Sequence, residues 1–264
     1  MDNKELLNRA KDPKYISGIY NYCDRWCERC QFSSRCLNCT VVKEQFGDLQ
    51  ENDLQNEEFW QKLSEMFQNT LVMLKEMAKK EGIDIDAINA EQICGNDDIR
   101  EKNSTVDILS HMSMNYAKLV NAWFESNENL FYEKEYEMNL IRIIPTHNNP
   151  TKEAESISDS TEIIHWYQYQ IHVKLKRACE SASEEELEED DFPKDSDGSA
   201  KVALIGIDRS ISAWNILLSF FPERKKQILT LIMLLENTQK NVENRFPGAR
   251  GFVRPGFDEI KQRD

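Results

Sequence analysis

Five of the seven cysteines lie in one short stretch, CDRWCERCQFSSRCLNC, and this crowding constrains the fold more than any other feature. The spacing is C-x3-C-x2-C-x5-C-x2-C, at Cys23, Cys27, Cys30, Cys36 and Cys39. Packing alone gives no reason to gather five thiols here, whereas convergence of four thiolates on one ion or cluster does. The N-terminal residues are polar and lack an apolar signal core, so we expect a reducing compartment, where thiols bind metal. The sequence therefore predicts a metal-binding N-terminal segment.

A helix at this position would bring several thiols together. If residues 15–30 are helical, the first three cysteines lie at i, i+4 and i+7 and share one face. The following turn would return Cys36 or Cys39 as the fourth ligand. Three thiols on one helix face leave room for a body larger than a single ion, so this geometry favours a [4Fe–4S] iron–sulfur cluster, with zinc as the alternative.

Parts of this spacing resemble known cluster-binding families. The C-x2-C-x5-C portion, from Cys27 to Cys36, is similar to the end of the iron–sulfur loop in endonuclease III-like DNA glycosylases. The C-x3-C-x2-C portion, from Cys23 to Cys30, looks like the radical-SAM cluster motif. The chain shows neither the helix–hairpin–helix pattern of the first family nor the alternating strands and helices of the second. The sequence therefore predicts neither activity.

Helical periodicity recurs along the rest of the chain between polar breaks. Only 9 Gly and 7 Pro among 264 residues argue against a loop-rich β protein. Apolar residues follow steps of three and four from Phe59 to Met77, Val106 to Trp123 and Ile164 to Ala178. Residues 201–221 are apolar around most of the helix circumference, which predicts a central buried helix, and residues 223–244 predict a last one. We expect an all-α bundle of five or six helices.

Composition divides the chain into a Cys-rich N-terminal segment, a first part of the bundle, an acidic loop, two C-terminal bundle helices and an extended tail. These parts cover residues 1–46, 47–180, 181–199, 200–246 and 247–264. The acidic loop carries nine acidic residues against Lys194, a net charge of −8 out of the total of −14. It lacks the apolar surface that would offset its ordering entropy, so a flexible loop is predicted.

A second candidate site lies on the helix predicted at residues 160–182, which Asp159 would cap. On the face opposite the apolar stripe, Glu162 and His165 have the Glu-x-x-His spacing by which ferritin-like bundles hold a metal, and Tyr169 and His172 share this face. Such bundles need further ligands, for which the chain offers three partial substitutes: Asp107, His111 and Glu125. A solvated polar face is the simpler interpretation of the same pattern.

Asp208 interrupts the most apolar of the predicted helices, and a buried charge needs a partner. It shares a stripe with Ser212, Asn215 and Ser219, which predicts a polar seam facing a cavity, with Arg209 as another participant. A structural ion pair is the first interpretation and a ligand-binding or catalytic role is the second.

The charge balance limits the partners. An acidic surface disfavours nucleic acid and anionic lipid, and no apolar stretch is long enough for a membrane span. Phosphate-binding loops, dinucleotide turns and nucleophile elbows are absent from the sequence. We therefore expect a cytoplasmic protein, and whether it is an enzyme stays open.

Three functions fit these patterns. The first is a metal-binding protein with a cysteine-ligated iron–sulfur cluster or structural zinc. The second is a helical-bundle metalloenzyme of oxidoreductase type, with an interior site built from Glu162, His165, His172, Asp208 and Arg209. The third is an interaction adaptor, in which zinc holds the N-terminal segment and the acidic loop binds basic partner proteins.

Overall fold

All regular structure in the described residues is helical. The computed structural model describes residues 3–46, 57–80, 82, 108–141, 150–185 and 194–259. These contain α-helices and short 3-10 helices and no strand, which confirms the predicted all-α class. The chain forms two compact units. The smaller comprises Met1–Asn21, Arg25–Thr105 and Pro255–Asp264, and the larger comprises Tyr22–Asp24 and Val106–Arg254.

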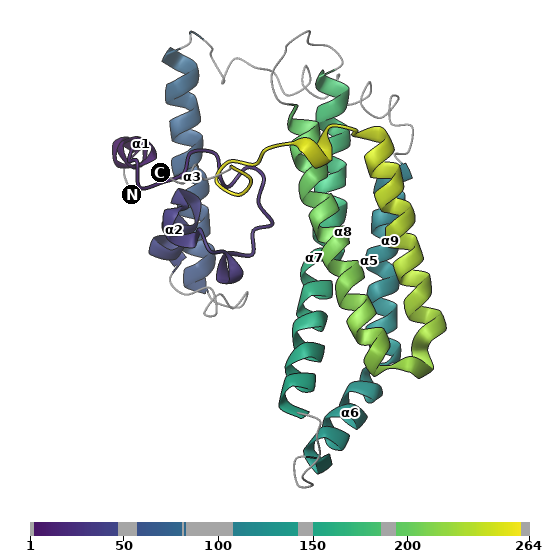
Figure 1. Ribbon diagram of the computed structural model, residues 1–264. Helices are drawn as coiled ribbons and strands as arrows, with labels where there is room; N and C mark the ends of the chain where they lie inside the picture. The colour runs from purple at the N-terminus through teal and green to yellow at the C-terminus, as the bar shows by residue number, and fades with distance from the viewer. Residues whose placement is uncertain are drawn as a thin grey trace, which may run out of the picture. The chain divides into compact units, whose positions relative to one another are not determined.

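Four long helices form the larger unit, which we call the bundle unit. They are α5 (Ile108–Ser126), α7 (Pro150–Glu185), α8 (Asp195–Phe220) and α9 (Lys225–Arg245). The helices pack in a closed ring in which α5 contacts α7, α7 contacts α8, α8 contacts α9, and α9 contacts α5. Figure 1 shows them side by side, each antiparallel to its neighbours in the ring. A shorter helix, α6 (Glu128–Ile141), follows α5 and packs on α7.

The predicted apolar stripe of α7 forms one wall of the core. All five of its residues are at most 1% exposed: Ile164, Tyr167, Ile171, Leu175 and Ala178. The predicted burial of α8 is also confirmed, and its Trp214 is fully buried against the rings of Trp123 and Phe124 on α5. The indole Nε1 of Trp214 donates to the hydroxyl of Tyr116 at 2.9 Å, so the polar atoms of both rings are paired inside the core.

Three helix boundaries differ from the prediction. Helix α7 begins at Pro150, where a missing amide costs nothing, so Asp159 lies inside the helix and does not cap it. Both ends of the predicted acidic loop are helical, because α7 continues to Glu185 and α8 begins at Asp195. Acidic side chains in the first turn of α8 are favoured by the helix dipole, which explains why this end is ordered. Residues 186–193 lie outside the described residues.

The C-terminal segment is also more ordered than the predicted extended tail. Helix α9 is followed by the 3-10 helix Ala249–Gly251, and Ala249 is completely buried. The lysine Nζ of Lys201 donates to the carbonyls of Phe252 at 2.5 Å and Arg250 at 3.3 Å, which fixes this segment on α8.

The smaller unit contains α1 (Asn3–Ala10), α2 (Leu37–Phe46) and α3 (Glu57–Lys80). The helix predicted from Phe59 to Met77 is present as α3. Several of its apolar side chains, however, are about half exposed or more: Phe67, Leu71, Val72, Leu74 and Met77. Periodicity therefore identified the helix but not a surface that covers it. The helix predicted from Val106 to Trp123 is present as α5, and its first predicted residues, before Ile108, lie outside the described residues.

The prediction of a helix over residues 15–30 is wrong. This segment consists of turns and one 3-10 helix, Cys27–Arg29. Gly18 and Arg25 have φ angles of +70° and +60°, in the left-handed region, and a right-handed helix cannot pass through such residues. The three cysteines therefore do not lie on one helix face.

Helix α8 is long and apolar enough to meet the criterion for a membrane-crossing helix, and half of the qualifying window is buried in the protein. The core helix of a bundle has the same properties. The expectation that no segment spans a membrane therefore stays a prediction.

Gly206 allows α8 to pack closely against α7, because it has no side chain. A Cβ at this position would lie 2.8 Å from Cδ1 of Tyr167 and 3.2 Å from Cγ1 of Ile171. Replacing a glycine inside a helix by alanine ordinarily stabilises by about 1 kcal/mol, but this contact has no room for a methyl group. We expect Gly206→Ala to lower the free energy of unfolding by about 1–3 kcal/mol in urea titrations.

The matched control is Gly251→Ala, because a Cβ at Gly251 meets nothing within 4 Å. This substitution should change stability by less than about 0.5 kcal/mol. A stabilising Gly206→Ala would contradict the packing described here.

Candidate functional site

Two C-x2-C pairs lie in tight turns of the smaller unit. Cys27 opens the 3-10 helix Cys27–Arg29 and Cys30 closes it, with the Cys30 amide donating to the Cys27 carbonyl at 3.3 Å. Cys36 closes the second 3-10 helix, Ser33–Arg35, and Cys39 lies in the first turn of α2. The amide of Cys39 donates to the sulfur of Cys36 at 3.5 Å. Each pair is therefore held by local backbone geometry.

Three of these four cysteines take part in a small apolar cluster. Cys36 and Cys39 are 9% and 3% exposed and pack with Ile19, and Cys27 packs against the same cluster. No disulfide joins any of the six cysteines that the structure describes, and Cys94 lies outside them. Among the described residues, no three His, Cys, Asp or Glu side chains are arranged so that they could hold a metal ion.

Cys23 belongs to a different part of the structure, because the segment Tyr22–Asp24 is part of the bundle unit. Oδ2 of Asp24 accepts from the hydroxyl of Tyr167 at 2.6 Å and from NH1 of Arg209 at 2.8 Å. The Asp24 carbonyl accepts from Trp166 Nε1 at 3.0 Å and from the Gln170 amide. Four groups thus hold this segment on α7 and α8, and sequence reasoning missed Asp24 entirely.

Tyr167 lies at the centre of this cluster, since Arg209 also donates to its hydroxyl. Burial raises the pKa of Tyr167 well above its ordinary value, and the neighbouring Asp24 carboxylate raises it further, against the opposing effect of Arg209. The phenol is therefore neutral and donates a hydrogen bond. Arg209, expected beside Asp208, instead pairs with Asp24.

Asp195 holds the same segment at a second point. The hydroxyl of Tyr22 donates to Oδ1 of Asp195 at 2.9 Å, and Ser181 Oγ donates to Oδ2 at 2.9 Å. Arg177 forms a two-pronged contact, with Nε at 3.2 Å from Oδ2 and NH2 at 2.8 Å from Oδ1. Burial raises the pKa of Asp195, but the hydrogen bonds from Arg177, Tyr22 and Ser181 outweigh it and leave the pKa below its ordinary value.

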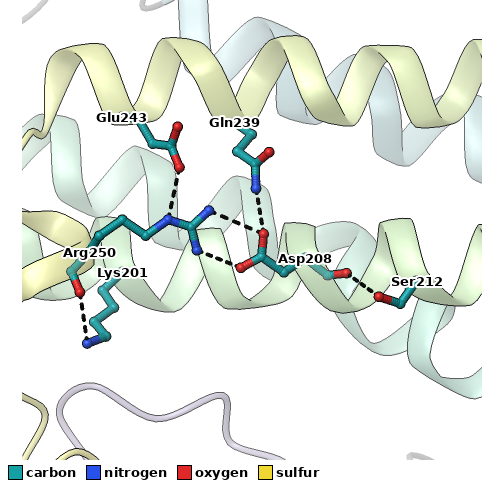
Figure 2. Close-up of polar contacts among 6 residues, drawn as sticks. All are labelled: Lys201, Asp208, Ser212, Gln239, Glu243 and Arg250. Carbon is teal, nitrogen blue, oxygen red and sulfur yellow. Dashed lines mark hydrogen bonds and ion pairs between the residues drawn. The ribbon is translucent and has the colours of Figure 1, made fainter.

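Asp208 forms the ion pair that was the first interpretation, and its partner is Arg250. NH1 and NH2 of Arg250 lie 2.6 Å and 3.2 Å from the two carboxylate oxygens, and Gln239 also donates to Asp208 (Figure 2). Nε of Arg250 donates to Glu243 at 2.9 Å. Hydrogen bonds to these two carboxylates raise the pKa of Arg250.

The expected burial of Asp208 is wrong, because 43% of its side chain is exposed. The polar seam facing a cavity is wrong as well. Ser212, Asn215 and Ser219 are exposed, and each donates to a carbonyl of its own helix. Polar side chains that bond back to the helix occupy the solvated face and leave no interior pocket there.

The polar face of α7 divides among different partners. The ring of His165 packs on that of Phe124 at 4.2 Å between centroids, and burial lowers the pKa of His165. Tyr169 accepts from Asn121 Nδ2 at 2.7 Å. His172 Nδ1 lies 3.1 Å from Ser113 Oγ and 3.2 Å from the Ser110 carbonyl. Glu162 is exposed.

These contacts do not gather the residues of the predicted metalloenzyme site around one centre. Of the three partial substitutes, Glu125 is exposed, His111 lies on α5, and Asp107 is outside the described residues. Comparison of the chain with protein-family models, curated proteins and solved structures finds no match. A function for this chain must therefore be argued from its own residues.

The lowered pKa of Asp195 predicts a pH-dependent contribution to stability. Because the folded pKa lies below the unfolded value of about 3.9, the ionised carboxylate stabilises the fold at higher pH, and this contribution is lost as the pH falls through the folded pKa. Asp195→Asn should lower stability by about 1–2 kcal/mol at pH 7. In urea titrations the difference from the parent protein should shrink as the pH is lowered from about 5 to 3.

Glu125→Gln on the exposed face of α5 is the control for this experiment. It removes a carboxylate for which the structure shows no comparable set of donors. A pH-independent effect of Asp195→Asn would show that the carboxylate charge is not what stabilises the segment.

The Asp208–Arg250 pair should behave as a surface ion pair, because about half of both side chains is exposed. A double-mutant cycle with Asp208→Asn and Arg250→Met should give a coupling energy of about 0.2–1 kcal/mol that decreases in 1 M salt. A coupling above about 2 kcal/mol, or one insensitive to salt, would contradict a surface pair.

Proposed function

We propose that this chain is an intracellular metal-binding protein in which Cys27, Cys30, Cys36 and Cys39 hold a structural zinc ion. The observation that carries the proposal is the pair of C-x2-C turns in the smaller unit. Two short turns, each offering two sulfurs, are the usual construction of a tetrahedral four-cysteine zinc site. The larger iron–sulfur cluster was favoured only if three thiols shared one helix face, and that helix is not present.

The proposed ligands differ by one residue from the set suggested by the sequence, which was Cys23, Cys27 and Cys30 with either Cys36 or Cys39. The four cysteines from Cys27 to Cys39 belong to one compact unit, whereas Cys23 belongs to the Tyr22–Asp24 segment of the bundle unit. We therefore assign Cys39 as a ligand and leave Cys23 outside the site. Arg29 and Arg35, which lie between these cysteines, supply positive charge that would offset part of the charge of four thiolates.

Zinc would also stabilise the smaller unit, whose described residues form only a small buried cluster. Its cluster of buried residues consists of Ile19, Cys36 and Cys39, with a few partly buried neighbours, while described apolar side chains of α3 face solvent. Small units with little core commonly depend on a metal. Among the described residues no three such side chains are arranged to hold an ion, so zinc binding would require the four sulfurs to move closer together.

The other functions fare differently. A structural zinc is compatible with an interaction adaptor, but five of the nine acidic residues in the loop expected to bind basic partners lie at 186–193, outside the described residues. The metalloenzyme is not proposed, because the contacts of His165, His172 and Asp208 lead to separate partners.

Metal analysis of anaerobically purified protein tests the proposal. We expect about one zinc per chain by mass spectrometry and no visible absorption band, because four thiolates in tetrahedral geometry match zinc. Cys→Ser substitution at each of Cys27, Cys30, Cys36 and Cys39 should reduce zinc at least threefold and lower the melting temperature. Cys179→Ser and Cys23→Ser, the matched controls, should keep the metal.

Three results would overturn the assignment. Brown protein with iron and sulfide would replace zinc by a cluster on the same segment. Protein without either metal would remove the proposed function. Loss of zinc in Cys23→Ser, with zinc kept in either Cys36→Ser or Cys39→Ser, would show that the ligand set is the one first suggested by the sequence.

A further inference from the structure

A groove of about 560 Å³ lies on the bundle unit at some distance in sequence from the cysteines. Six of its lining residues come from α5, and α7 and α9 contribute one each. Sites for small organic molecules typically occupy about 300–1,000 Å³, so the groove is large enough to hold one. Neither the proposed zinc site nor the ion pairs described above involve these residues.

The polar groups of the groove are nitrogen-rich. His111, Asn115 and Lys118 line it from α5, and His172 lines it from α7. None of the described lining residues is acidic, although the chain has 47 acidic residues against 33 basic ones. The ammonium of Lys118 repels cations and attracts anions, so this groove suits a negative group and not a metal ion.

The ring of His172 is already oriented. Its Nδ1 lies 3.2 Å from the carbonyl of Ser110, which can only accept, and this contact favours the tautomer with the hydrogen on Nδ1. Ser113 Oγ lies 3.1 Å from the same nitrogen and can donate to the carbonyls of Leu109 at 2.7 Å and Ser110 at 3.1 Å. Nε2 is then the ring nitrogen that meets a ligand, and on protonation it becomes a second donor.

The rest of the lining is apolar and adaptable. Met112 and Met114 come from α5 and Leu234 from α9. Unbranched methionine side chains adjust to ligands of different shape. An apolar surface beside a cluster of nitrogen donors complements a molecule that has an acidic head and a hydrophobic body.

We infer that the groove binds a small amphiphilic anion, with its carboxylate, sulfonate or phosphate head at Lys118, His111 and His172 and its apolar body against Met112, Met114 and Leu234. The head group makes charge-assisted hydrogen bonds, and the body is removed from water. This inference does not depend on the proposed zinc site.

Two fluorescent probes with the same aromatic body separate the two contributions. 8-Anilinonaphthalene-1-sulfonate carries the anionic head, and N-phenyl-1-naphthylamine lacks it. We expect Lys118→Met to weaken binding of the sulfonate at least fivefold while binding of the neutral probe changes less than twofold. Lys226→Met, which removes an exposed lysine of α9 outside the groove, is the matched control and should leave both affinities unchanged.

Histidine resonances locate the probe independently, because the chain has four histidines and each signal can be assigned with a His→Gln variant. The sulfonate should shift the imidazole signals of His111 and His172 and leave that of His165 in place. Equal weakening of both probes by Lys118→Met would overturn the anionic preference. Binding that moves neither His111 nor His172, such as binding to the exposed face of α3, would overturn the location.

Discussion

The hydrogen bond between Trp214 and Tyr116 is the interaction around which the bundle is built. Both side chains are fully buried, and a buried indole N–H or phenol without a partner would cost several times what one surface contact provides. Their pairing joins α8 to α5, which lie opposite one another in the four-helix ring. Burial raises the pKa of Tyr116 to about 12, so the phenol stays neutral. The aromatic rings that surround Trp214 complete the packing.

Arginine–carboxylate contacts then connect parts of the bundle unit that are distant in sequence. Arg177 holds Asp195, Arg209 holds Asp24, and Arg250 holds Asp208. The planar guanidinium can donate to both carboxylate oxygens at once, which fixes direction as well as distance. The contact between Arg209 and Asp24 joins residues 185 positions apart, so its main effect is to determine which segments of the chain pack together. These arginine and aspartate side chains are nevertheless all partly exposed, which limits what each ion pair contributes to the free energy of unfolding.

Much of the helical framework could be predicted, because periodicity reports directly on which side of a helix is buried. The α7 stripe from Ile164 to Ala178 is the clearest case. The α3 stripe marks the limit of this reasoning, since the same pattern predicts a helix without saying what covers it. Acidic composition was misleading at Asp195, where four hydrogen bonds from three side chains order a residue assigned to a flexible loop.

The candidate sites were less predictable, for two physical reasons. The number and type of the cysteines are visible in the sequence, but their arrangement depends on the left-handed backbone of Arg25, which has no reliable sequence signal in a non-glycine residue. Partners such as Arg250 for Asp208 depend on contacts across 42 residues, and no local pattern encodes these. The groove on α5 was missed because its lining comes from three helices.

Gly198 has a consequence for how the bundle unit comes apart. A Cβ there would lie 2.6 Å from Cδ1 of Tyr22 and 2.8 Å from Cζ of Phe252, and these two rings meet edge to face at 4.7 Å between centroids. The segment at Tyr22 and the segment at Phe252 thus pack on the same part of α8, beside Gly198. Because each ring packs against the other, we expect the Tyr22 and Phe252 segments to detach from α8 together.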